Sequence, residues 1–176
     1  MSAPGPARKS KGNDNFETPW AVFEALNAEF RFTLDPCASE NNRKCERWLE
    51  GPCDGTENCG CGLCADWLEH AVFVNPPYSQ IRLWLEKGID AAERGATVVT
   101  LIGASTSPAW FREKVFRRAV DVFFVYPRIQ FIHPPACACK ACAEGRKGSN
   151  GSDSLVVVYR PGRSEGGPRF SLWTWA

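Results

Sequence analysis

The chain has 176 residues, of which 44% are hydrophobic and 23% are charged, and its formal net charge is +1. These values indicate a folded globular protein and exclude a collagen-like or wholly disordered chain. The apolar runs are too short to span a bilayer, and residues 1–11 lack the apolar core of a signal peptide. We therefore expect a cytoplasmic protein that makes no membrane contact.

The N-terminal part of the chain predicts a tail, a helix and a short strand. Residues 1–14 are rich in Pro, Gly, Lys and Ser and show no apolar period, which predicts a disordered tail. Thr18 is a suitable N-cap, and Pro19 suits the first turn of a helix that runs to residue 30. The alternating residues 31–34 then predict a short strand that ends in a loop.

Strands and helices alternate along the rest of the chain. Apolar runs predict strands at residues 71–74, 97–102, 120–126, 155–159 and 169–173. Helical spacing predicts a helix capped by Ser79 and another from Ser107 to Arg118. This alternation predicts an α/β fold with a mostly parallel sheet and helices on both faces. The last two strands have no helix between them, so we expect them to pair antiparallel at one edge.

Two Cys-rich segments, residues 51–65 and 133–152, interrupt this pattern and show no core character. We therefore expect one domain over residues 15–176 that carries two loop insertions. Charge is also uneven, because residues 108–176 hold 11 Lys and Arg against 5 Asp and Glu. A basic half suits a polyanion-binding face, although solvated surface charge is the commoner cause of such a bias.

The loop Asn75-Pro76-Pro77-Tyr78 lies between a predicted strand and a predicted helix. The loop thus lies at the carboxyl end of the predicted strand, and open α/β sheets bind their ligands at that edge. The prolines remove two N–H donors, which leaves nearby carbonyls free as acceptors. An Asn oxygen and such a carbonyl can accept both hydrogens of a planar amino group, and the Tyr ring offers a face for base stacking. An ordinary Pro-rich turn is the alternative interpretation of this loop.

The sequence resembles the S-adenosylmethionine-dependent amino-methyltransferases, whose catalytic loop is [Asn/Asp/Ser]-Pro-Pro-[Tyr/Phe/Trp]. Within them it is most similar to the phage-type, Dam-like DNA N6-adenine methyltransferases, over about residues 15–160. The stretches that carry the resemblance are Glu17–Trp20, Phe32–Ala38, Asn42–Cys45, Val72–Ser79, Trp84, Arg128–Phe131 and Ser154–Val158. The resemblance implies a Rossmann-like methyltransferase fold.

The resemblance also implies a catalytic role for the loop. Asn75 and the Pro76 carbonyl would orient the adenine N6 amino group, with Pro77 holding the loop, and Tyr78 would stack on the base. The base must leave the duplex, because N6 is otherwise inside it. Ser79 and Arg128 would contact DNA, although Arg128 has the alternative of an ordinary surface residue.

A second set of residues, which also includes Asn75, would bind the cofactor by the same resemblance. Asp35 and Pro36 would contact its methionine or ribose end, and Thr18 and Pro19 would close over the methionine part. Asp66 would accept from its adenine amino group, although a cap or salt bridge explains an Asp there equally well. Residues 35–39 lack the Gly-x-Gly turn common at this motif, and non-Gly residues allow a less close backbone approach.

The chain holds nine cysteines, and two runs of them repeat the spacing Cys-x-Cys-x-x-Cys. Tetrahedral zinc takes four ligands, commonly all Cys in a structural site. We predict structural zinc bound by residues among Cys53, Cys59, Cys61, Cys64, Cys137, Cys139 and Cys142. One zinc bridging both loops and two zincs sharing thiolates both stay open, as do redox-active or disulfide-linked thiols and surface cysteines. The family resemblance does not account for these loops.

The sequence therefore predicts an S-adenosylmethionine-dependent methyltransferase acting on adenine N6 in DNA, with DNA as its partner. No obligate protein partner is evident, and the resemblance implies a phage or prophage protein in a bacterial host. Two alternatives stay open. One is an amino-methyltransferase acting on RNA or protein, and the other is an inactive, metal-stabilised nucleic-acid-binding module.

Overall fold

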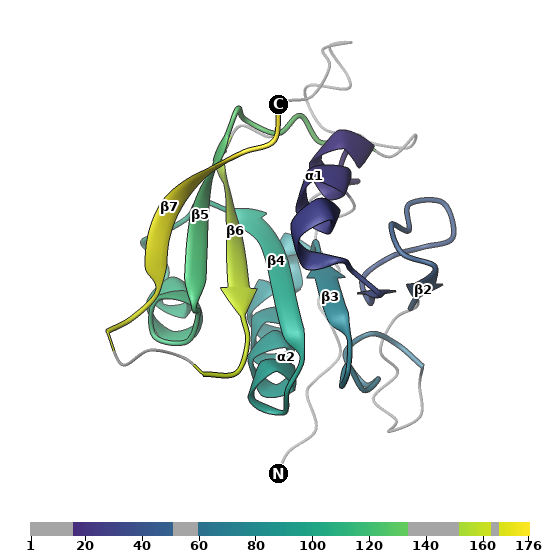
Figure 1. The fold of residues 1–176 in the computed structure, drawn as a ribbon, viewed down its shortest axis with the longest axis horizontal. Coiled ribbons are helices and arrows are strands. Elements are labelled where there is room, and N and C mark those ends of the chain that lie inside the picture. Colours follow the sequence, from purple (N-terminus) through teal and green to yellow (C-terminus); the bar gives the residue numbers. More distant parts are fainter. Residues whose placement is uncertain (1–15, 51–59, 134–151, 163–165) are drawn as a thin grey trace.

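The computed structural model describes residues 16–50, 60–133, 152–162 and 166–176 (Figure 1). Its sheet has seven strands in the order β2-β1-β3-β4-β6-β5-β7. The strands are β1 (Leu34–Asp35), β2 (Arg47–Trp48), β3 (Ala71–Val74), β4 (Thr97–Gly103), β5 (Asp121–Tyr126), β6 (Ser154–Tyr159) and β7 (Arg169–Thr174). The helical elements are α1 (Trp20–Phe30), the 3-10 turn η1 (Tyr78–Gln80), α2 (Ile81–Glu93) and the π-helix η2 (Phe111–Phe116).

The sheet is mostly parallel, as the sequence predicts. Strands β2, β1, β3 and β4 pair parallel, and β5 pairs parallel with β7. Antiparallel pairing occurs in the β4-β6-β5 part of the sheet. The expectation that the last two strands pair with each other is wrong, because β6 lies between β4 and β5 while β7 takes the outer place beside β5.

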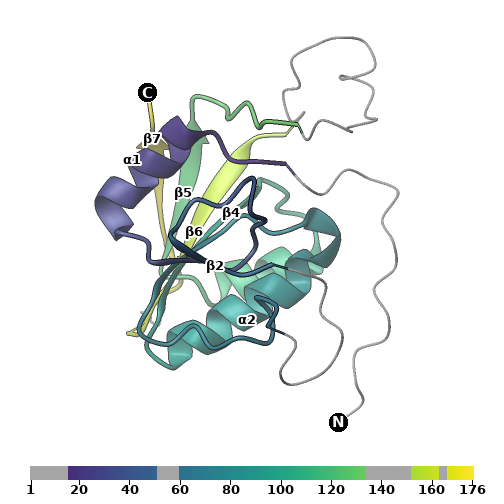
Figure 2. The same cartoon turned by 90° about the vertical axis from the view of Figure 1, so that its right-hand side faces the viewer.

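Helices cover both faces, which confirms the layered α/β architecture. Figure 2 shows α1 on one side of the sheet and α2 on the other. The α1 face buries Val22, Phe23 and Leu26 against strand residues that include Phe73. The hydrophobic cluster buried on the α2 face is larger than the one on the α1 face. All six residues of β6 are buried, because its alternating side chains meet both covered faces.

The helix starts differ from those expected. Thr18 does not cap α1, since no side-chain cap is present and the Pro19 carbonyl accepts from the N–H groups of Val22 and Phe23. Ser79 does not cap α2, because it lies inside η1 and α2 begins two residues later. In the segment expected to be helical up to Arg118, the structure has the short π-helix η2.

The end of the first Cys-rich segment belongs to the core. Cys61 is 3% exposed, and the Trp67 indole N–H donates to the Gly62 carbonyl at 2.9 Å. A Cβ at Gly62 would lie only 1.8 Å from the Pro36 carbonyl oxygen, so backbone packs on backbone there. The expectation that residues 51–65 lack core character is therefore wrong for these residues, because the buried Trp67 ring stacks on Trp84 and anchors the turn.

Candidate active site

Asp35 and Asn75 lie at the ends of two neighbouring strands. Asp35 is the last residue of β1, and Asn75 directly follows β3. The two strands pair parallel, so both residues lie at the carboxyl edge of the sheet. The strand order also reverses here, since β2 follows β1 on one side and β3 flanks it on the other. Such a switch point is where open α/β sheets bind their ligands.

A cavity lies at this point. It is lined by Phe16, Glu17, Thr18, Asp35, Cys37, Asn42, Lys44, Phe73, Asn75 and Pro77. The structure thus brings four predicted site residues together: Thr18, Asp35, Asn75 and Pro77. Pro19, Pro36 and Pro76 are chain neighbours of these lining residues.

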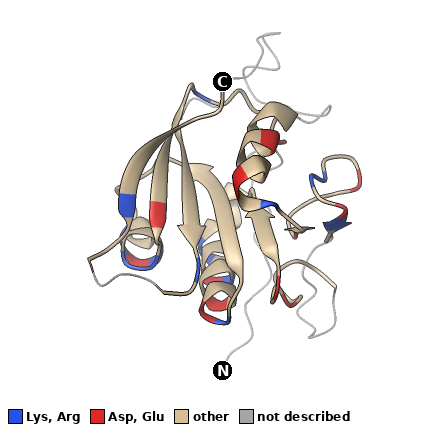
Figure 3. Ribbon diagram, in the orientation of Figure 1, with Lys and Arg blue, Asp and Glu red and all other residues tan. Residues whose placement is uncertain are grey.

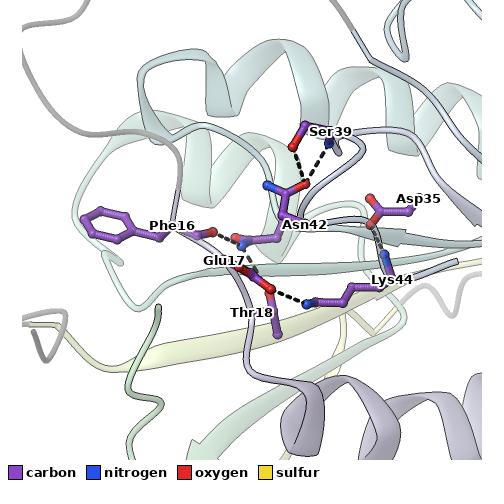
Figure 4. A network of polar contacts seen from close by, with 8 residues as sticks. Phe16, Glu17, Thr18, Asp35, Ser39, Asn42 and Lys44 are labelled. Carbon is purple, nitrogen blue, oxygen red and sulfur yellow. Dashed lines mark hydrogen bonds and ion pairs between the residues drawn. The ribbon is translucent and has the colours of Figure 1, made fainter. Parts of the chain in front are cut away.

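Asp35 is a buried carboxyl group, only 4% exposed. The backbone N–H of Lys44 donates to its Oδ2 at 3.0 Å (Figure 4), and that of Cys37 donates to Oδ1 at 3.4 Å. Burial raises the pKa of Asp35 to about 6, and the two N–H donors and the Lys44 charge offset only part of this effect. Near pH 7 the group is therefore mainly a carboxylate, but it can be protonated in mildly acidic solution.

Lys44 supplies a buried positive charge beside this carboxyl group. Its Nζ lies 2.8 Å from Glu17 Oε1, and its side chain is 2% exposed (Figure 4). The same Nζ lies 4.4 Å from the centre of the Trp20 ring. Glu17 also exchanges both backbone hydrogen bonds with Ile132, each at 2.9 Å. The segment of residues 16–19, here called the N-terminal strap, is thus tied to the loop after β1 and to the chain after β5.

The loop Asn75–Tyr78 contacts the N-terminal strap through Asn75. Its Nδ2 donates to the Phe16 carbonyl at 2.8 Å and to Thr18 Oγ1 at 3.1 Å. The Pro77 carbonyl accepts from the Gln80 N–H at 2.9 Å. Within the described part of the chain, the Pro76 carbonyl receives no hydrogen bond. It is therefore a loop carbonyl that is available to a ligand.

Tyr78 is half-buried and packs against the α2-side core at the start of η1. Ser79 follows it in the same turn. The structure thus places both residues directly after the cavity-lining Pro77. This position agrees with a role beside the cavity rather than inside it.

Asp66 is not brought to the cavity. Its carboxylate accepts from the Leu68 N–H and pairs at 3.4 Å with Arg94. The Leu68 N–H and the Arg94 charge lower the pKa of this exposed group. Arg94 follows the last residue of α2, a helix of 13 residues that begins at the carboxyl edge of the sheet and is about 20 Å long. Asp66 therefore lies towards the opposite edge of the sheet. Its contacts match the alternative interpretation of this residue, a cap or salt bridge.

Arg128 follows β5, whose carboxyl end faces the same edge as that of β4. Its Nε and terminal nitrogen bind Asp153 Oδ1 at 2.8 and 2.7 Å. Other basic side chains of this half of the chain are also paired with acids: Lys114 with Glu86, Arg118 with Glu93, and Arg160 and Arg169 with Asp121. Figure 3 shows basic and acidic residues interspersed on α2 and η2. The excess of basic residues in sequence therefore gives no continuous basic surface on these helices.

Sequence reasoning assigned no role to six residues that line the cavity: Phe16, Glu17, Cys37, Asn42, Lys44 and Phe73. The stretches Glu17–Trp20 and Asn42–Cys45 were part of the family resemblance, and this was the available signal. Burial and the nearby Asp35 charge raise the pKa of Cys37. Cys37 is therefore a neutral thiol in the wall of the cavity near pH 7.

Most of the predicted zinc ligands lie outside the described residues, namely Cys53, Cys59, Cys137, Cys139 and Cys142. Cys61 and Cys64 are described and form one turn, with the Cys64 N–H donating to the Cys61 carbonyl at 3.1 Å. No group of three or more His, Cys, Asp or Glu side chains that could hold a metal ion occurs among the described residues. Nor does this part of the chain contain a helix long and apolar enough to cross a membrane.

The mixed sheet and the Asn-Pro-Pro-Tyr loop at its carboxyl edge define a methyltransferase of the amino-methylating class. The family model for DNA N-6-adenine-methyltransferase (Dam) matches residues 6–174, and the chain belongs to this family. It is thus an adenine-specific DNA methyltransferase, its substrate is DNA, and its class uses S-adenosylmethionine.

Two curated relatives agree with this assignment. A DNA N-6-adenine-methyltransferase of Haemophilus phage HP1 (strain HP1c1) is 32% identical over 128 residues, which cover 71% of this chain and 70% of the relative. A protein of the same name from Escherichia phage T1 is 31% identical over 102 residues, which cover 57% of this chain and 40% of the relative. Both relatives are phage proteins.

Proposed function

We propose that the cavity between β1 and β3 binds S-adenosylmethionine and that the loop Asn75–Tyr78 holds the target adenine beside it. The observation that supports this proposal is that Asp35 and Asn75, from two neighbouring strand ends, line one cavity at the switch point of the sheet. A cofactor residue and a catalytic residue in one cavity satisfy the basic need of a transfer reaction, which is proximity.

The charges that line the cavity fit the cofactor. Glu17 and Asp35 supply two carboxylates, and Lys44 supplies one ammonium group. S-adenosylmethionine carries an ammonium, a carboxylate and a sulfonium, so its net charge is positive and the three side chains together balance it. We propose that Asp35 and the adjacent Pro36 hold the methionine or ribose end, with the N-terminal strap residues Thr18 and Pro19 over the methionine part.

When bound, the cofactor supplies an electrophilic methyl carbon on sulfur. The loop residues supply orientation. Asn75 Oδ1 and the Pro76 carbonyl accept the two N6 hydrogens, which turns the nitrogen lone pair towards the methyl carbon. The same two oxygens would stabilise the positive charge that the nitrogen gains when it takes the methyl group and S-adenosylhomocysteine is left. The proton leaves the nitrogen afterwards, so no general base is required before attack.

Tyr78 and the residues after it serve the DNA side of the reaction in this proposal. The Tyr78 ring stacks on the extruded adenine, a contact worth about 1–3 kcal/mol. Ser79, in the same turn, contacts the DNA beside the extruded base. Arg128 contacts a phosphate at the same edge of the sheet.

Methyl transfer from labelled cofactor to duplex DNA tests the proposal. Asn75→Ala and Tyr78→Ala should abolish transfer, while circular dichroism stays as in the wild type and Tyr78→Ala still binds S-adenosylhomocysteine. Undiminished methylation by either variant would overturn the assigned role of that residue. Digestion of DNA from an expressing host with methylation-sensitive nucleases identifies the methylated sequence.

The repeated Cys-x-Cys-x-x-Cys runs support a separate proposal, a structural zinc site. Metal analysis of protein purified without chelators should find at least one zinc ion per chain. A zinc content near zero would contradict this proposal and favour redox-active, disulfide-linked or surface cysteines.

A further inference from the structure

The side-chain amide of Asn75 can serve as an acceptor only in one of its two orientations. An amide has two N–H donors at one end and a carbonyl acceptor at the other. A rotation of 180° would present Nδ2 to the adenine amino group, so that donors would face donors. The proposed function therefore requires that something hold the amide in the productive orientation, and the loop prolines have no side-chain polar group that could do so.

The N-terminal strap provides this constraint. The Phe16 carbonyl can only accept, so the Asn75 atom 2.8 Å from it must be Nδ2. Thr18 Oγ1 lies 3.1 Å from the same nitrogen and accepts its second hydrogen. Both donors of the amide are then used. Oδ1, to which no described residue donates, is left as the free acceptor at the cavity.

Two further observations indicate that Thr18 is committed to this contact. Thr18 is 2% exposed, so water cannot readily replace its hydroxyl group. Its sequence position suggests a helix cap, yet the Pro19 carbonyl accepts from the first N–H groups of α1 and the Thr18 hydroxyl faces Asn75 instead. The N-terminal strap is itself anchored by the Glu17–Lys44 ion pair and the Glu17–Ile132 bridge.

From this geometry we propose that Thr18 is a positioning residue. Its hydroxyl group, with the Phe16 carbonyl, holds the Asn75 amide so that Oδ1 faces the adenine N6 amino group. This inference rests on the proposed role of Asn75 and adds to it. It also differs from a simple cofactor contact, because Thr18 acts here through Asn75 and should affect kcat more than cofactor affinity.

Two substitutions distinguish the effect of the Thr18 hydroxyl group from the effect of the shape of its side chain. Thr18→Val keeps the shape and removes the acceptor, so kcat should fall about tenfold. Thr18→Ser keeps the acceptor, so kcat should stay within about twofold of the wild type. The dissociation constant of S-adenosylhomocysteine, measured by calorimetry, should stay within about twofold for both variants. Thr33→Val, which removes an exposed hydroxyl bonded to His70 away from the cavity, is the matched control and should leave kcat unchanged.

Three results would overturn the inference: an unchanged kcat in Thr18→Val, an equal loss of activity in Thr18→Ser, or a loss of cofactor affinity that accounts for the whole effect. If Asn75→Ala is fully active, the proposed function itself fails. If Asn75→Ala is inactive while Thr18→Val is as active as the wild type, only the present inference fails.

A measurement on the wild-type protein covers the case that Thr18→Val does not fold. The two Asn75 Nδ2 protons should exchange with solvent more slowly than those of the exposed Asn41 side chain, as seen by nuclear magnetic resonance. Equal exchange rates for the two side chains would show that the amide is not held and would contradict the inference.

Discussion

The ammonium group of Lys44 lies 2.8 Å from the carboxylate of Glu17, although the Lys44 side chain is only 2% exposed. A buried ammonium needs such a partner, because the loss of hydration otherwise costs several kcal/mol. The pair joins two segments that are far apart in sequence, and the face of Trp20 covers the same nitrogen. Charge pairing thus fixes the N-terminal strap over the loop that carries Asp35.

Loss of the Glu17 carboxylate should destabilise the protein. In Glu17→Gln the buried Lys44 ammonium loses its counter-charge, and we expect the free energy of unfolding to fall by about 1–3 kcal/mol. Urea denaturation of the purified variant measures this change. Glu24→Gln, an exposed position on α1, is the control and should change stability by less than about 0.5 kcal/mol. A Glu17→Gln protein as stable as the control would contradict the prediction.

Asp35 should make cofactor affinity depend on pH. Its pKa is raised to about 6 by burial, so the carboxylate that we propose faces the cofactor is lost as the pH falls through about 6. We expect the affinity for S-adenosylmethionine, measured by calorimetry from pH 5 to pH 8, to fall below pH 6. Asp35→Asn should bind weakly throughout and show a flatter profile. A wild-type profile that is flat across this range would contradict the role of Asp35.

The raised pKa of Asp35 also makes the free energy of unfolding depend on pH. A salt-bridged Asp, whose pKa is lowered, destabilises the protein when the pH falls, whereas Asp35 does the opposite. The folded protein binds a proton at Asp35 below about pH 6, whereas the unfolded chain does so only near the ordinary value of 3.8. Folding therefore takes up a proton between these values, and the contribution of Asp35 to stability increases as the pH falls from about 6 to about 4. Relative to Asp35→Asn, the wild type should gain stability over this interval.

Gly62 should not tolerate a side chain. A Cβ there would lie 1.8 Å from the Pro36 carbonyl oxygen and 2.9 Å from the Trp84 ring, so the backbone beside Asp35 would have to move. We expect Gly62→Ala to lower the free energy of unfolding by about 1–3 kcal/mol and to weaken cofactor binding. Gly103→Ala is the matched control for stability, because nothing lies within 4 Å of its added Cβ. Equal stability of the two variants would show that the turn can shift at little cost.

Arg128 should contribute one phosphate contact to DNA binding. Arg128→Ala should weaken the binding of duplex DNA of any sequence and reduce the slope of log affinity against log salt by about 1. Asp153→Asn removes the acid that now holds Arg128 and should strengthen binding. Fluorescence anisotropy over a series of salt concentrations measures both effects. A salt slope unchanged in Arg128→Ala would place this arginine outside the DNA interface.

The main strands and α2 were predictable because their signal is local. The residues of β4 form an apolar run, and α2 repeats its buried residues at helical spacing. The position of β6 was not predictable in this way, because strand pairing depends on partners distant in sequence. The two-residue strand β2 was missed because so short an element has no period.

In the site too, features with a local sequence signal were predictable and contacts between distant residues were not. The family resemblance supplied the role of Asp35, and for Asn75 it added to the position of the loop at a strand end, where open α/β sheets bind ligands. Glu17 and Lys44 were missed because a buried ion pair exists only once the fold brings two segments together. The helix-cap interpretation of Thr18 was wrong because its hydroxyl group has a tertiary partner, Asn75, that outweighs the local preference.

The position of β6 sets the order in which the chain can complete its sheet during synthesis. Strand β6 is made late, at residues 154–159, yet it separates β4 from β5 and is buried along its whole length. Until it leaves the ribosome, β4 has one unpaired edge and β5 has two, because β7 is made later still. A chain that stops before residue 154 should therefore aggregate, even though it already contains Asp35, Asn75 and the cavity between them.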